Sequence, residues 1–62
     1  MKKWYSVELC PELAQLLKVW LRAKCVAYET SDCGTRDYPC IHFSMCMDDE
    51  TAGLADNFLE EL

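Results

Sequence analysis

Thiols and one imidazole are the side chains of this sequence with the most obvious chemistry. Five cysteines and a single histidine occur among 62 residues. Cys40, His42 and Cys46 share one face of a segment that alternates like a strand, and Cys33 lies in the turn before it. Because zinc is usually bound by four nitrogen or sulfur ligands, Cys33, Cys40, His42 and Cys46 are the candidate metal ligands.

The spacing of these residues nevertheless favours packed thiols over a metal site. No Cys-x-x-Cys pair is present, and strand residues two apart lie about 7 Å from one another. Several cysteines fall at positions typical of a core, where free cysteine behaves as a small hydrophobe. We therefore expect no metal and no other cofactor.

Nucleophilic catalysis is disfavoured for the same residues. A catalytic cysteine needs a low-pKa thiolate beside a base, and a third group that orients the base. His42 is the only histidine and lies in the same strand as Cys40, and the carboxylates gather on a helix where burial would not tune them. We expect that the protein is not an enzyme.

The odd number of cysteines, without a recognisable signal peptide, argues against a secreted disulfide scaffold. The longest apolar stretch is interrupted by Gln15, Lys18, Arg22 and Lys24, so no membrane span or membrane partner is expected. These features predict reduced thiols and a cytoplasmic location.

Charge is distributed unevenly along the chain. The first 36 residues carry all six lysines and arginines and four acids, whereas the rest carry seven acids and no lysine or arginine. Such a field repels nucleic acid and attracts basic surfaces. The alternative is that the acids only keep a small domain in solution.

The acids after Arg36 therefore form the candidate surface for a basic protein partner, to which Glu29 could add from the sheet. The candidate partner-binding residues are Asp37, Asp48, Asp49, Glu50, Asp56, Glu60 and Glu61.

The elements that must position these groups follow from hydrophobic periodicity. Period-two alternation predicts strands over residues 4–9, 25–30 and 38–47. A helix should begin at Pro11 and bury Leu13, Leu16, Leu17, Trp20 and Leu21, while a second should begin at Asp48–Glu50 and bury Thr51, Leu54, Ala55, Phe58 and Leu62.

The order β-α-β-β-α predicts one α+β domain over residues 1–62. We expect a three-stranded antiparallel sheet of order 1-3-2 with both helices on one face, a ferredoxin-like unit without its final strand. This order also resembles the front of an RNA-recognition module. Those modules use aromatic and basic side chains, whereas the open face here offers His42 and Ser44 and the net charge is −5. Direct nucleic-acid binding is not expected.

In size, acidity and α+β layout, the chain resembles the small inhibitors encoded by phages and mobile elements, anti-CRISPR proteins above all. We expect a monomer, and the resemblance implies an inhibitor in the host cytoplasm. It would block the nucleic-acid-binding subunit of a bacterial defence complex, by DNA mimicry or steric occlusion. The alternatives are a Cys/His metal-binding regulatory module and a homodimeric structural protein.

Overall fold

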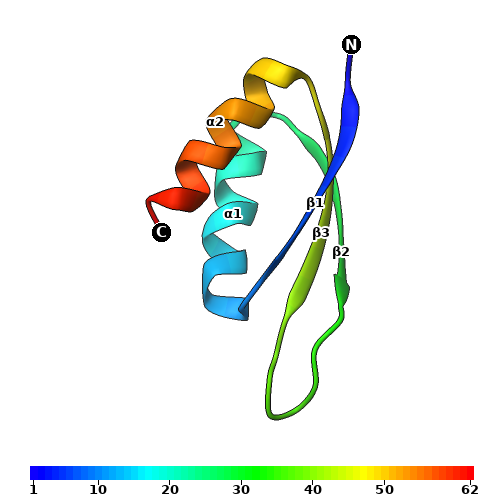
Figure 1. The fold of residues 1–62 in the computed structure, drawn as a ribbon, viewed down its shortest axis with the longest axis vertical. Helices are drawn as coiled ribbons and strands as arrows, with labels where there is room; N and C mark the ends of the chain where they lie inside the picture. Colours follow the sequence, from blue (N-terminus) through cyan, green and yellow to red (C-terminus); the bar gives the residue numbers. More distant parts are fainter.

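A computed structural model describes all residues, 1–62. The chain forms five elements in the order β-α-β-β-α, as predicted: β1 (Lys3–Leu9), α1 (Pro11–Ala23), β2 (Ala27–Asp32), β3 (Ile41–Met47) and α2 (Asp49–Glu60). Both helices lie on the same side of the sheet, and the turn between β2 and β3 extends beyond them at one end (Figure 1). Neither α1 nor α2 combines the length and the hydropathy that a membrane-spanning helix requires.

The sheet has the predicted antiparallel order β1-β3-β2. β3 is central and pairs on both sides, with Ser44 opposite Ser6 of β1 and Glu29 of β2. This register places His42 between Glu8 and Ser31. The open face of the sheet is therefore formed by the alternate residues that point away from the helices.

The core lies between the sheet and the helices. Phe43, Met45 and Met47 of β3 are buried, and they pack with Leu17 and Leu21 of α1. Two small residues, Ala14 of α1 and Ala55 of α2, complete the buried cluster. Trp20 and Phe58 stack between the helices with ring centroids 5.5 Å apart.

The C-terminus of α1 is closed by Cys25, whose backbone has the left-handed helical conformation. Cys25 has φ 57°, and the amides of Cys25 and Val26 donate to the carbonyls of Arg22 and Leu21 at 3.1 and 2.9 Å. This pair of bonds is the Schellman arrangement, in which glycine usually takes the left-handed position. The strand predicted to begin at Cys25 therefore begins at Ala27, because residues 24–26 cap the helix.

The N-terminus of α2 is capped by Asp48. Its carboxylate accepts a hydrogen bond of 2.8 Å from the Thr51 amide. The Tyr5 hydroxyl donates to the Asp49 carboxylate at 3.0 Å, so that β1 is tied to the first turn of the helix. The acidic start of α2 thus has a structural role, as the helix dipole favours.

Some burial predictions are wrong in detail. Leu16, Leu54 and Leu62 are 50%, 46% and 40% exposed, because the helices cover one sheet face and leave their outer sides uncovered. β3 begins at Ile41 and not at Tyr38, since residues 33–40 form the turn.

The cysteines do not occupy the core. Cys10, Cys25 and Cys33 are exposed, and Cys40 and Cys46 are half-buried. Their positions lie on the open sheet face, in the turn and at helix ends, where no second layer covers them.

Candidate functional site

Two thiols meet at the end of the β2–β3 hairpin. Cys33 directly follows Asp32 and Cys40 directly precedes Ile41, the last paired residues of the two strands. The Cys33 amide donates to the Cys40 carbonyl at 3.2 Å. Their Sγ atoms are also 3.2 Å apart. The sequence singled out both residues, and antiparallel pairing brings them side by side.

Glu8 brings a carboxylate to the same place from the neighbouring strand β1. Its Oε2 lies 3.7 Å from the Cys33 Sγ and 3.6 Å from the Cys40 Sγ. The donor atoms of Glu8, Cys33 and Cys40 all lie within 4.8 Å of one another. We call these three residues the thiol–carboxylate cluster.

The turn that holds the cluster is closed by its own hydrogen bonds. The Thr35 amide donates to the Tyr38 carbonyl at 3.0 Å, and the Tyr38 amide donates to the Thr35 Oγ1 at 3.1 Å. A Cβ on Gly34 would overlap the backbone of Tyr38 and Cys40. Glycine is required here by close backbone approach, and the packed turn fixes the separation of the two thiols.

The electrostatics of the cluster oppose a reactive thiolate. The hydrogen bond to the Cys33 thiol, partial desolvation and the Glu8 carboxylate raise the pKa of Cys40 to about 11. A nucleophilic cysteine needs a lowered pKa, supplied by a nearby cation or a helix N-terminus. The pKa of the Cys40 thiol is therefore shifted away from the range of a nucleophilic cysteine.

The four candidate ligands identified from sequence do not form one group. His42 contacts Glu8, with 3.9 Å between its Nδ1 and the Oε1, but it is not among the three clustered donors. Cys46 pairs with Trp4 and Ala27 at the opposite end of β3 from Cys40. Cys46 is six positions after Cys40 along extended chain, which corresponds to a separation of about 20 Å.

Glu8 is the member of the cluster that sequence reasoning missed. Alternation along β1 already placed Glu8 with Trp4 and Ser6 on one face. The missing information was the register, which sets Glu8 opposite His42 and therefore next to the turn.

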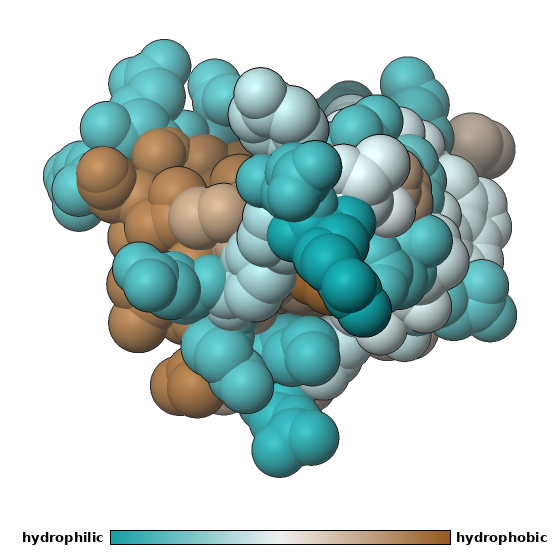
Figure 2. Space-filling view, turned by 90° about the horizontal axis from the view of Figure 1, so that it is seen from below, coloured by the Kyte–Doolittle hydropathy of each residue, from teal (hydrophilic) through white to brown (hydrophobic).

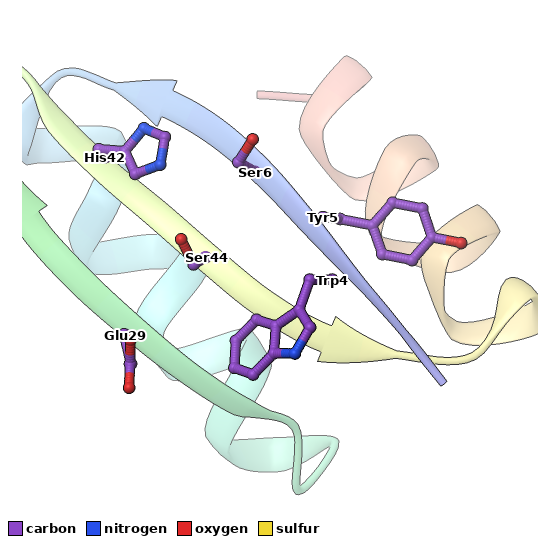
Figure 3. A pocket seen from close by; sticks show the side chains of 6 residues that line it. All are labelled: Trp4, Tyr5, Ser6, Glu29, His42 and Ser44. Carbon is purple, nitrogen blue, oxygen red and sulfur yellow. The ribbon is translucent and has the colours of Figure 1, made fainter. Parts of the chain in front are cut away.

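A shallow hollow of about 440 Å³ covers the middle of the open sheet face. Figure 3 shows Trp4, Ser6, His42 and Ser44 on this side of the sheet, while Tyr5 points toward α2. Trp4 is 62% exposed and supplies the only large apolar ring there. Glu29 adds a negative charge from β2, which opposes contact with phosphates.

The acids of α2 lie on its outer side. Asp49, Asp56 and Glu60 recur at spacings of seven and four residues, so they share one helix face. Glu50 and Glu61 lie next to that face, and all five residues are exposed. None of them is paired with a lysine or arginine, because the one ion-pair contact in the molecule joins Glu8 and His42.

The other predicted acidic residues lie elsewhere or have local partners. Asp37 is in the β2–β3 turn, at the far end of the molecule from the start of α2 (Figure 1). Hydrogen bonds from Thr51 lower the pKa of Asp48, and the N-terminus and Lys2 lower it further. Asp49 accepts from Tyr5. The unengaged acids of α2 are therefore Glu50, Asp56, Glu60 and Glu61; we call these four residues the acidic face.

An apolar surface borders the acidic face. It surrounds a hollow of about 390 Å³ between the outer sides of the two helices. Its lining residues are Leu16, Val19, Trp20, Ala23, Phe58 and Leu62. Figure 2 shows this hydrophobic area on the helical side of the molecule, surrounded by hydrophilic side chains.

No known protein family, curated protein or solved structure matches the chain.

Proposed function

We propose that this protein binds a basic protein surface through the acidic face of α2, and that it acts as a small inhibitor of the anti-CRISPR kind. The observation that carries the proposal is the exposed, unpaired state of Glu50, Asp56, Glu60 and Glu61. Carboxylates that have no internal partner remain available for charge-assisted hydrogen bonds to arginine and lysine.

The charge density of α2 supports mimicry of a nucleic-acid strand. With Asp49, five carboxylates from Asp49 to the C-cap residue Glu61 span about 18 Å of helix axis, a mean spacing of roughly 4.5 Å. One DNA strand carries a phosphate about every 3.4 Å along the helix axis. A groove that binds phosphates would therefore find a similar density of negative charge on this helix.

The neighbouring apolar surface supports a protein partner over a simple polycation. Leu54, Phe58 and Leu62 recur at four-residue spacing, beside Glu61 on the same helix. An apolar centre with a charged rim is the usual composition of a specific protein interface. Acids present only for solubility would not need to border such a surface.

The test uses expression in bacteria that carry a CRISPR–Cas system, with phage plaquing as the readout. We expect the chain to restore plaquing, and tagged protein to capture a nucleic-acid-binding subunit that duplex DNA displaces. Reversing the four residues of the acidic face to lysine should abolish plaquing and weaken binding by roughly a hundredfold at low salt.

The control reverses three acids outside the acidic face, Glu12, Glu29 and Asp37, and is compared with a variant that reverses only Asp56, Glu60 and Glu61, so that both change the net charge equally. Asp48 and Asp49 are left unchanged because they stabilise α2. Equal loss of binding in both variants would mean that net charge, and not the acidic face, determines binding. Undiminished binding after reversal of the acidic face would contradict the proposal.

A further inference from the structure

A carboxylate from one strand and two thiols from a neighbouring turn meet at the end of the hairpin. Glu8 comes from β1, and Cys33 and Cys40 come from the β2–β3 turn, 25 and 32 residues further along the chain. We infer that Glu8, Cys33 and Cys40 bind one Zn²⁺ ion. This inference is independent of the acidic face and uses none of its residues.

The distances between the donors agree with a tetrahedral zinc site. Zn–S bonds of about 2.3 Å and Zn–O bonds of about 2.0 Å place sulfur and oxygen ligands about 3.5 Å apart, and two sulfurs about 3.8 Å apart. The Glu8 oxygen lies 3.6 and 3.7 Å from the two sulfurs. The sulfurs are 3.2 Å apart, so metal binding needs only a small opening of the pair.

The charges at the cluster also favour a cation. Glu8 faces two ionisable thiols, and no lysine or arginine lies within 4.0 Å of its carboxylate. Zn²⁺ would displace one proton from each thiol, forming two Zn–S bonds and releasing two protons to solvent. Because the ion replaces two protons, the cluster carries one negative charge before and after binding, and the two thiolates form only together with the metal.

The fourth position of the metal would be open to water. Glu8 and Cys33 are exposed and Cys40 is half-buried, so the cluster faces solvent. His42 lies against the other oxygen of Glu8, at 3.9 Å, where it can orient the carboxylate as a positioning residue. The metal would replace the two weak thiol–carboxylate hydrogen bonds that join edge strand β1 to the hairpin turn.

The experiment titrates Zn²⁺ into the full chain, kept reduced with a metal-free phosphine, in competition with a chromophoric chelator. We expect one zinc per chain and a higher melting temperature with the metal. Co²⁺ in place of zinc should give thiolate-to-metal absorption corresponding to two sulfur ligands. The Cys33→Ser and Cys40→Ser variants should each show about half of this absorption at saturating Co²⁺, one thiolate in place of two, and bind zinc at least roughly tenfold more weakly.

Cys46→Ser is the matched control for the thiols, because Cys46 lies on the same face at the far end of β3. Glu29→Gln is the control for Glu8→Gln, since both carboxylates lie on the open face. We expect both controls to bind like the parent. His42→Ala should weaken zinc binding without changing the cobalt–thiolate absorption, as a ligand-orienting role requires.

Three outcomes would overturn the inference: no stoichiometric zinc in the reduced protein, unchanged binding after Glu8→Gln, or unchanged binding after loss of both thiols. Circular dichroism shows whether the serine variants fold, and Glu8→Gln provides an independent test because Glu8 is exposed. A Cys33–Cys40 disulfide in protein that binds no zinc after reduction would replace the metal site with a redox pair.

Discussion

The two faces of β3 differ more than its central position would suggest. On one face, Phe43, Met45 and Met47 are almost completely buried beneath the helices. On the other, His42, Ser44 and Cys46 remain partly exposed, although strands flank them on both sides. One layer of helices covers the sheet, and no second layer covers the opposite face (Figure 1).

This difference separates stability from ligand chemistry. The covered face contains the apolar side chains whose burial drives folding. The open face contains Glu8, His42 and the nearby thiols, which can bind a ligand without disturbing the core. Substitutions of adjacent β3 residues should therefore have very different consequences.

The largest expected effect is from Phe43→Ala. Removing this fully buried ring should lower the free energy of unfolding by about 3–5 kcal/mol. A chain of this size has a total stability of about 3–9 kcal/mol, so the variant should be partly unfolded at room temperature. Denaturant unfolding followed by circular dichroism measures the loss.

Ser44→Ala is the matched control for Phe43→Ala, one residue away on the opposite face. It should change the free energy of unfolding by no more than about 0.5 kcal/mol. Comparable losses at both positions would mean that something covers the open face in solution, and the contrast between the two faces would fail.

A smaller effect of opposite sign is expected at Cys25, where α1 returns the chain to the sheet. A non-glycine residue at φ 57° is strained, and Cys25→Gly should raise the free energy of unfolding by about 1 kcal/mol. Cys10→Ser is the control, since that cysteine lies at the other end of α1 in extended conformation. A destabilised Cys25→Gly variant would show that the cysteine side chain contributes contacts that outweigh the strain.

The smallest effect concerns the cap that holds α2 over the covered face. The pKa of Asp48 is lowered from 3.8 in the folded state, so its contribution to stability is complete above that pH and is lost as pH falls through the folded pKa. Asp48→Asn keeps a capping oxygen at every pH, whereas Asp48→Ala removes the cap throughout.

Melting temperatures from pH 7 to pH 2 test this prediction. The difference between the parent and the asparagine variant should change only below about pH 4, with the parent losing more stability. The alanine variant should melt a few degrees lower than the parent at pH 7. Parallel curves for all three proteins would exclude an ionised cap.

The periodicity of the chain predicted its architecture because each element has a strong pattern of its own. Tyr5, Val7 and Leu9 alternate, and Leu17 and Leu21 recur at helical spacing. Exposed Leu16 could not be predicted, since it lies on the same broad stripe as Leu17 and only the position of α2 decides which of them is covered. Likewise, an αL cysteine cap has no distinctive signal where glycine is the usual residue.

The sequence by itself determined the element order, the sheet topology and the excess of acid after Arg36, because these follow from short-range patterns of polarity. Only the tertiary structure decided which groups meet. Strand register placed Glu8 opposite His42, and hairpin pairing placed Cys33 beside Cys40, so that the carboxylate meets both thiols. Register depends on pairing between segments remote in the chain, so the spacing of residues within a single segment does not determine it.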